Sequence, residues 1–210
     1  MQQLLEVSKA AGVKRFLFAS TIGVYGNQYN MLLHEDLPLN PVDPYSESKA
    51  IGESALRGAN TDDFCTTALR IAMVYGLGPK VREDFLVNRL CIDAATTGRL
   101  SIMGGTQKRP QIHVDDLASL FLTLLQYDKE KICGKVFNAV ESNPALSELV
   151  EVIRKLLPAI EVQLLPGRAH EDSFEMDGQL LFNQIGFRPS TPLESGMQEL
   201  INYYRSVAKG

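Results

Sequence analysis

The segment RFLFAS, residues 15–20, decides the fold class of this chain. Its apolar residues follow one another instead of alternating with polar ones, which is typical of a parallel strand covered by helices on both faces. A helix predicted over residues 2–10 stops near Gly12 and leads into this strand. Ser20 and Thr21 then place hydroxyl groups at the carboxyl end of the strand, where parallel sheets carry their sites.

The alternation of helix and strand continues to the end of the chain. Short apolar runs predict strands, and longer segments with one apolar face predict helices between them. The predicted strands cover residues 64–72, 100–105, 135–140 and 161–165, and the predicted helices cover residues 44–58, 81–98, 113–127, 145–158 and 192–207. This alternation predicts an α/β fold with a parallel sheet.

The composition is that of an ordinary globular protein. The 210 residues are 45% hydrophobic and 22% charged, with a formal net charge of -4 and a pI near 5.4. This balance gives no electrostatic reason to expect nucleic acid or an anionic membrane as a partner. No apolar run approaches the roughly 20 residues that span a bilayer, and the first residues lack the basic start and apolar centre of a signal peptide.

Cysteines and histidines are scattered along the chain. Cys65, Cys91 and Cys133 are odd in number and form no CxxC motif, which favours reduced thiols in a cytoplasmic protein over a disulfide framework or a metal site. None of the three histidines stands at metal-ligand spacing from another histidine or cysteine. We therefore expect a cytoplasmic location and no bound metal.

The stretch DPYSESKA, residues 43–50, opens the second predicted helix. Its first aspartate suits the N-cap, and the proline after it suits the first turn. Tyr45 and Lys49 project from the same face of this helix, where a nearby ammonium favours the phenolate that a general base requires. The spacing alone is weak support, because Tyr127 and Lys131 repeat it elsewhere.

The neighbouring motifs distinguish the pair of Tyr45 and Lys49 from the pair of Tyr127 and Lys131. Four motifs follow one another: FASTIGVYG at residues 18–26, DPYSESKA at 43–50, LRIAMVYGLGP at 69–79 and RPQIHVDDLA at 109–118. This ordered set resembles the extended short-chain dehydrogenase/reductase family, in its NAD-dependent epimerase/dehydratase branch, over essentially the whole chain.

The resemblance implies an architecture as well as an activity. The expected fold is the C-terminal part of a Rossmann-type parallel sheet with helices, plus a small C-terminal substrate lobe. The expected division assigns residues 1–75 and 112–140 to a partial dinucleotide-binding domain, and residues 76–111 and 141–210 to the substrate-binding lobe.

Roles for individual residues also follow from the resemblance. Thr21, Tyr45 and Lys49 match the catalytic residues of the family, with Tyr45 as the base that removes a proton from a substrate hydroxyl. Ser20, Tyr45 and Lys49 are expected to bind the cofactor, Lys49 through the nicotinamide ribose.

On the substrate side, the resemblance points to Thr21, Met73 and Arg109. Arg109 matches the family arginine that contacts the phosphate of a nucleotide sugar. Two departures from the family pattern weaken the assignment of a nucleotide sugar as substrate, because Met73 replaces a common asparagine and Asp172 replaces a family arginine. Arg168 is a candidate to compensate for the second loss.

Other polar residues in these motifs have structural explanations. Tyr25 and Tyr75, in the two VYG turns, are interpreted as packing residues. Asp115 and Asp116 complement the positive end of a helix. His113 is interpreted as structural.

A typical part of a dinucleotide-binding fold is absent from the sequence. No GxGxxG or relaxed GxxGxxG motif occurs, although such a turn normally holds the cofactor pyrophosphate at a helix N-terminus. NAD is the expected cofactor, and NADP stays open. The strand over residues 15–20 resembles an interior strand with nothing ahead of it to flank it. We therefore expect an exposed apolar edge and self-association, with a homodimer as one form.

Three hypotheses for function follow. The first is an NAD-dependent epimerase or oxidoreductase that acts on a sugar hydroxyl, with a nucleotide sugar as substrate; Ile22 and Gly23 disfavour dehydration, because dehydratases of this branch carry Asp-Glu there. The second is an NAD(P)H-dependent carbonyl reductase for a smaller or lipophilic substrate, which Met73 and Asp172 favour. The third is a truncated, catalytically incompetent fragment or a non-catalytic binding protein.

Overall fold

The computed structural model describes residues 1–165 and 173–208 and confirms an α/β fold with parallel strands. In chain order its elements are α1 (Gln2–Ala10), β1 (Arg15–Thr21), η1 (Ile22–Tyr25), β2 (Leu32–Leu33), α2 (Pro44–Ala59), β3 (Cys65–Ile71), β4 (Met73–Tyr75), α3 (Leu86–Thr97), β5 (Arg99–Met103), β6 (Gln111–His113), α4 (Val114–Gln126), α5 (Lys129–Ile132), β7 (Val136–Ala139), α6 (Leu146–Leu156), β8 (Glu161–Leu165), β9 (Glu175–Met176), α7 (Gln179–Ile185) and α8 (Leu193–Val207).

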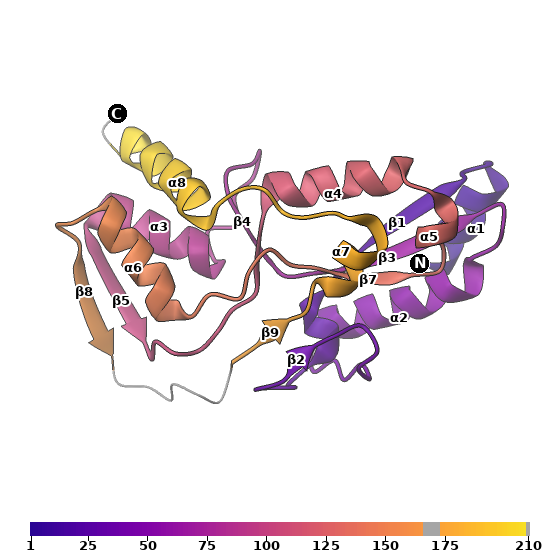
Figure 1. Cartoon of the computed structure of the whole chain (residues 1–210), viewed down its shortest axis with the longest axis horizontal. Helices are drawn as coiled ribbons and strands as arrows, with labels where there is room; N and C mark the ends of the chain where they lie inside the picture. The colour runs from indigo at the N-terminus through magenta and orange to yellow at the C-terminus, as the bar shows by residue number, and fades with distance from the viewer. Residues whose placement is uncertain (166–172, 209–210) are drawn as a thin grey trace.

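The central sheet has three parallel strands in the order β1-β3-β7. Helices α2 and α4 lie on opposite faces of it (Figure 1). The middle strand, β3, is buried at every position except its last residue, although it carries the polar residues Thr66, Thr67 and Arg70. Strand β1 forms the edge, and Ala19 within it is exposed. The segment that resembles an interior strand therefore has one free side in this chain.

The remaining strands form parallel pairs, β2-β9, β4-β6 and β5-β8. One end of the molecule in Figure 1 holds α3, α6 and α8 packed with β5 and β8, away from the central sheet. Leu90, Leu149 and Leu200 belong to the apolar cluster there, whereas Leu69 and Phe137 belong to the cluster around the central sheet. The division of the chain near residues 75, 111 and 140 stays a prediction.

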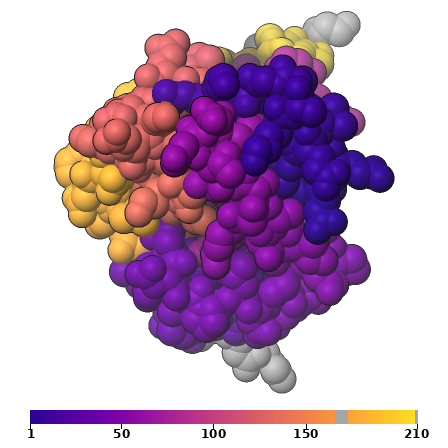
Figure 2. Space-filling model, turned by 90° about the vertical axis from the view of Figure 1, so that its right-hand side faces the viewer, coloured from indigo at the N-terminus to yellow at the C-terminus, as the bar shows by residue number. Residues whose placement is uncertain are grey.

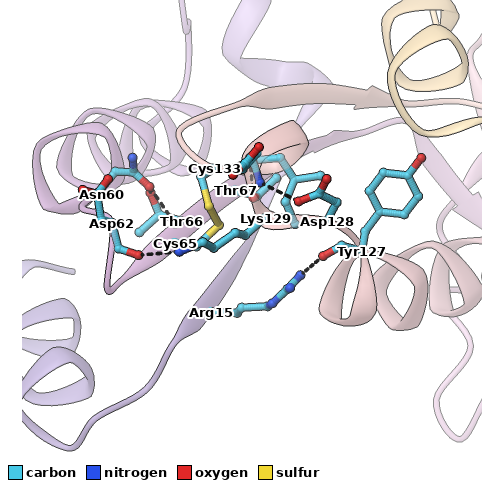
Figure 3. The surroundings of a disulfide bond; sticks show 12 residues. Arg15, Asn60, Asp62, Cys65, Thr66, Thr67, Tyr127, Asp128, Lys129 and Cys133 are labelled. Carbon is cyan, nitrogen blue, oxygen red and sulfur yellow. Dashed lines mark hydrogen bonds between the residues drawn. A yellow bond between two sulfur atoms is a disulfide. The ribbon is translucent and has the colours of Figure 1, made fainter.

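The first residue of β3 and the residue that follows α5 are joined by a disulfide, so the expectation of reduced thiols is wrong for two of the three cysteines. Cys65 and Cys133 are bonded across a sequence separation of 68, with Cα atoms 4.9 Å apart (Figure 3). Cys133 lies just before β7, and beside the bond the Gly134 N–H donates to the Thr66 carbonyl oxygen at 2.8 Å. Disulfides are typical of oxidising compartments, so the cysteines do not support the expected cytoplasmic location. Cys91 is a buried free thiol.

Near the free side of β1, the N-terminal residues form part of the molecular surface. Figure 2 views this end, with the N-terminal residues in indigo. Leu4 and Val7 of α1 and Ile51 of α2 are exposed there. Self-association through such a surface stays a prediction. None of the helices within the described residues is long and apolar enough to cross a membrane.

Candidate active site

The first turn of α2 is fixed by its capping residues. The carboxylate of Asp43 accepts hydrogen bonds from the Ser46 N–H at 3.0 Å and from the Ser46 hydroxyl at 2.7 Å. The hydroxyl bond, followed by the backbone bond, holds the pKa of Asp43 below its usual range. Pro44 occupies the start of the helix, where its missing N–H costs no hydrogen bond. Tyr45 is therefore held in the first turn.

Tyr45 and Lys49 lie beside each other near the carboxyl end of β1. The Lys49 Nζ donates a 2.8 Å hydrogen bond to the carbonyl oxygen of Ala19. It also lies 5.5 Å from the centre of the Tyr45 ring and 5.0 Å from that of Phe18. The Tyr45 residue is 59% exposed. The pair thus combines an accessible phenol with an ammonium anchored on the sheet.

Thr21 is brought close to the same turn of α2 by a glycine. The Thr21 Oγ1 accepts the N–H of Gly23 at 3.3 Å and caps η1. A Cβ on Gly23 would lie 2.3 Å from the Ser46 Oγ and 3.6 Å from the Thr21 Cγ2. Because Gly23 has no side chain, the turn after Thr21 packs directly against the residue that follows Tyr45.

Ser20 makes a different contact from its neighbour. Its side chain is buried, and its hydroxyl donates a hydrogen bond to the carboxylate of Glu53 on α2. The hydroxyl therefore serves the contact between helix and strand in this structure. The role of Ser20 in cofactor binding stays a prediction.

The two substrate-side residues lie on or beside the β4-β6 pair. Met73 pairs with Gln111, whose Nε2 is 3.7 Å from the Met73 sulfur. The Arg109 Nη1 donates to the Lys108 carbonyl oxygen at 2.9 Å, and its guanidinium lies 5.7 Å from the centre of the Phe174 ring. Their contact with a substrate stays a prediction. Arg168, the candidate to compensate, and Asp172, which replaces the family arginine, lie outside the described residues.

Another charged residue near Tyr45 was not recognised from the sequence. Arg82, in the segment between β4 and α3, forms a two-point ion pair with Asp84 at 2.7 and 2.8 Å. This hydrogen bonding to Asp84 raises the pKa of Arg82, and a negative charge on Tyr45, as the phenolate, would act in the same direction. Its only sequence signal is a pair of opposite charges two residues apart after the GLGP turn.

A second polar cluster involves residues that the sequence assigned to packing or structure. The carboxylate of Glu141 accepts the Tyr75 hydroxyl at 3.0 and 3.2 Å and the His113 N–H at 3.1 Å. The His113 side chain also caps α4 by accepting the N–H of Asp115. Burial raises the pKa of Glu141 from 4.5 to about 7, although these hydrogen bonds partly oppose the shift.

The Asp116 carboxylate binds the segment of the chain that follows α7. It accepts hydrogen bonds from the Ser190 N–H and hydroxyl at 2.9 and 3.1 Å and from the Thr191 N–H at 3.0 Å. The other aromatic residue of the VYG turns, Tyr25, is fully buried and donates to Asn138. These residues therefore tie segments together.

Replacing Glu141 by glutamine should reduce the dependence of stability on pH. Between pH 4.5 and about pH 7 the folded chain keeps a proton on Glu141 that the unfolded chain has lost, so the stability of the parent falls as pH rises through this range. Glutamine still accepts the hydrogen bonds and does not titrate. We expect the difference in free energy of unfolding between the parent and Glu141→Gln to change by about 1–2 kcal/mol over this pH range. This value is reduced for solvent screening of a partly exposed carboxylate. Urea unfolding at several pH values measures it, and parallel profiles would contradict the assignment.

No cluster of three or more His, Cys, Asp or Glu side chains within residues 1–165 and 173–208 is placed to hold a metal ion. The candidate site is instead built from a phenol, an ammonium and a hydroxyl, contributed by Tyr45, Lys49 and Thr21. These groups suit proton transfer to and from a hydroxyl or carbonyl oxygen.

Comparison with known proteins identifies the family. Residues 1–139 match the model of the NAD dependent epimerase/dehydratase family. The chain is 30% identical to the low-salt glycan biosynthesis protein Agl12 of Haloferax volcanii, over 97% of this chain and 66% of that protein. It matches the crystal structure of UDP-glucuronic acid 4-epimerase from Bacillus cereus in complex with NAD with a TM-score of 0.83 and 25% identity, over 99% of this chain and 66% of that one.

A third similar protein is MoeE5, whose structure was solved with UDP-glucuronic acid and NAD. The TM-score is 0.81 at 28% identity, over 98% of this chain and 70% of that one. The chain spans 66% of the length of Agl12 and of the Bacillus cereus epimerase, so roughly a third of each of these two proteins has no counterpart in it. With 139 of its 210 residues inside the family model, the chain belongs to the NAD-dependent epimerase/dehydratase family.

Proposed function

We propose that this chain carries the catalytic residues of an NAD-dependent epimerase or oxidoreductase that acts on a sugar hydroxyl of a nucleotide sugar. The observation that carries the proposal is the exposed phenol of Tyr45 next to Lys49, whose ammonium is bonded to the Ala19 carbonyl at the carboxyl end of β1. The similar solved structures named above support it, since one is a UDP-glucuronic acid 4-epimerase in complex with NAD and the other is MoeE5 in complex with UDP-glucuronic acid and NAD.

In this proposal each residue has a separate part in proton transfer. Tyr45, as the phenolate, accepts the proton of the substrate hydroxyl, and Lys49 favours that charged form. The Thr21 hydroxyl donates a hydrogen bond to the same substrate oxygen. NAD, when bound, supplies the hydride acceptor for the carbon that carries this oxygen. Epimerisation follows when the proton and the hydride return with the hydride on the opposite face of the sugar.

The residues of this chain fit one end of the cofactor. Lys49 and Tyr45 present a cation and a phenol at an accessible strand end, which suits the ribose and nicotinamide. The sequence contains no GxGxxG turn for the pyrophosphate. Cofactor binding by the 210 residues alone is therefore the first property to test.

Dehydration is disfavoured by the turn after Thr21. Ile22 and Gly23 supply no acid or base there. A side chain at position 23 would also meet the hydroxyl of Ser46, which is buried and bonded to Asp43. The turn therefore lacks both the group and the space that an eliminating carboxylate would need.

The alternative functions rest on specific observations. A carbonyl reductase is favoured by the thioether of Met73, which gives β4 an apolar group where a polar one would suit a nucleotide sugar. A non-catalytic or incompetent fragment is favoured by the missing pyrophosphate turn.

One experiment separates these functions. The purified chain is titrated with NADH while nicotinamide fluorescence is recorded, and is then incubated with NAD and either UDP-glucose or UDP-glucuronic acid. Saturable binding and formation of the C4 epimer, followed by NMR, are the expected results. Binding without epimer, combined with NAD(P)H-dependent reduction of simple ketones, would favour the reductase. Absence of binding would favour the non-catalytic alternative.

A further inference from the structure

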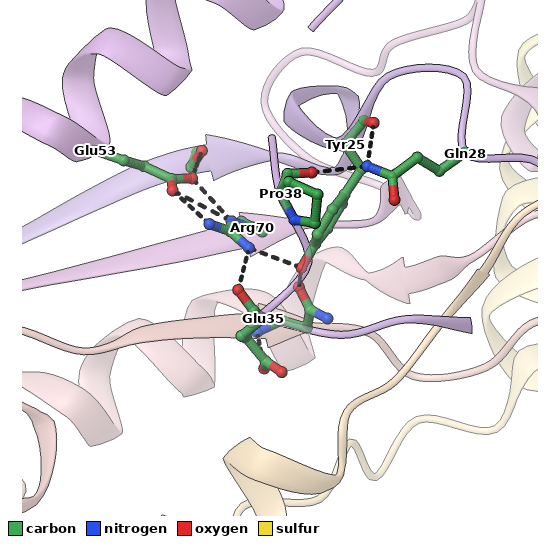
Figure 4. Close-up of polar contacts among 8 residues, drawn as sticks. Tyr25, Gln28, Glu35, Pro38, Glu53 and Arg70 are labelled. Atoms are coloured by element: carbon green, nitrogen blue, oxygen red, sulfur yellow. Dashed lines mark hydrogen bonds and ion pairs between the residues drawn. The ribbon is translucent and has the colours of Figure 1, made fainter. Parts of the chain in front are cut away.

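Helix α2 carries a buried charge one turn beyond Lys49. The carboxylate of Glu53 pairs with Arg70 of β3, with 2.9 Å between Nη2 and Oε2 and 3.2 Å from Nε to each oxygen. The two side chains are only 3% and 2% exposed for Arg70 and Glu53, respectively. Figure 4 shows the two planar groups facing each other. The reaction proposed above does not use this pair.

Arg70 also binds two segments that border the site. Its Nη1 donates to the Tyr25 hydroxyl and to the backbone carbonyl of Glu35, both at 3.0 Å (Figure 4). The Tyr25 hydroxyl in turn donates to the Asn138 Oδ1 of β7 at 2.7 Å. One guanidinium therefore connects α2 with β3, the turn η1 and the segment that leads into α2.

The carboxylate of Glu53 is also bonded to β1. Its carboxylate accepts the Ser20 hydroxyl, while Lys49, one turn earlier on α2, donates to the carbonyl of Ala19. Two successive residues of β1 are thus bonded to two successive turns of α2. Tyr45, Lys49 and Glu53 are spaced by four residues and share one face of the helix. These bonds define how far along β1 the helix lies.

The packing between α2 and β1 does not define that position. Gly52 lies against the Phe18 ring, where a Cβ would be 2.6 Å from the ring, so the contact brings the helix close to the strand. An apolar contact of this kind sets a separation, whereas a two-point ion pair has one favourable arrangement. A buried ion pair also adds little net stability compared with apolar side chains of similar volume. The distinctive effect of the Glu53–Arg70 pair is therefore to fix the position of α2 along the strands, and not to add net stability.

We propose that Glu53 and Arg70 are positioning residues, which hold α2 at the point along β1 where Lys49 reaches the Ala19 carbonyl and the Tyr45–Lys49 pair lies near Thr21. The kinetic consequence rests on the proposed function. The structural consequence, the placement of Lys49 against Ala19 and Phe18 of β1, does not depend on any activity.

The test replaces the pair by apolar residues of similar size, Glu53→Leu with Arg70→Met. The Lys49 ammonium lies 5.0 Å from the centre of the Phe18 ring of β1, so the ring current of Phe18 should shift the NMR signal of the Lys49 ε-methylene group. We expect this contribution to be lost in the double variant, because Phe18 stays on β1 while Lys49 moves with α2. We also expect kcat to fall by about tenfold or more with KM within about twofold, because misplacement of catalytic groups affects the chemical step. The matched control is Glu151→Leu with Arg154→Met, an exposed ion pair on α6.

Each outcome decides the proposal. A folded double variant with the Lys49 signal of the parent, or with the kcat of an active parent, would overturn it. If the double variant does not fold, Ser20→Ala removes a single contact of Glu53 and is examined for the same NMR signal, with an unchanged signal as the contrary result. If the parent itself turns over no substrate, the proposed function fails, and the Lys49 signal still decides whether the pair positions the helix.

Discussion

Replacing Tyr45 by phenylalanine should lower the turnover of a nucleotide sugar by about 10²–10⁴-fold, the contribution typical of a general base. Phenylalanine keeps the ring beside Lys49 and removes the group that is proposed to accept the substrate proton. Because Tyr45 is 59% exposed, the free energy of unfolding should change by less than about 0.5 kcal/mol. The measurements are kcat with NAD and nucleotide sugar, NADH affinity by fluorescence, and urea unfolding.

The chain contains a matched control for this variant. Tyr127 and Lys131 have the spacing of Tyr45 and Lys49, yet Tyr127 ends α4 and Lys131 lies on the short helix α5. Tyr127→Phe should leave turnover unchanged. Equal turnover in the parent and in Tyr45→Phe would refute the assignment of the base, whereas equal losses in both variants would indicate a general effect of removing a phenol.

Reducing the disulfide should lower the free energy of unfolding by about 2–4 kcal/mol. The bond between Cys65 and Cys133 closes a loop across a sequence separation of 68 and joins the start of β3 to the segment between α5 and β7. Its loss lets the unfolded chain explore more conformations, and the stabilisation of long loops is correspondingly large in the chain-entropy model. Urea unfolding with and without dithiothreitol measures the effect.

The control is the variant with Cys65→Ser and Cys133→Ser, whose stability should not respond to dithiothreitol. Thiol titration in denaturant should detect one free thiol, Cys91, in the oxidised parent and three after reduction, since the chain has three cysteines. Three thiols in the parent before reduction would show that the bond is absent in solution. Equal stability of the oxidised and reduced forms would contradict its expected contribution.

Features encoded within a few neighbouring residues were predictable. The strand RFLFAS is observed as β1, and the helix predicted over residues 44–58 is observed as α2, with the expected aspartate cap and proline start. Strand β2 was missed because it is only two residues long and pairs with β9, whose residues lie 143 positions later in the chain. Such a strand has no periodic pattern of its own, since its pairing partner alone defines it.

Features that depend on how distant segments lie together were not predictable. The cysteines gave no sign of pairing, because their bond depends on the segment after α5 lying beside the start of β3. Glu53 and Arg70 resemble ordinary charged residues of a helix and a strand until the fold buries them against each other. Arg82 likewise becomes relevant only when its segment comes near Tyr45.

The sequence by itself determined the alternation of helices and strands and the common helical face of Tyr45 and Lys49, because both follow from local backbone geometry. Only the tertiary structure decided which strands are neighbours and that Lys49 and Glu53 are bonded to successive residues of β1. The physical reason is that hydrogen bonds, ion pairs and a disulfide between elements depend on their relative position, and local patterning specifies an element without specifying its register against another.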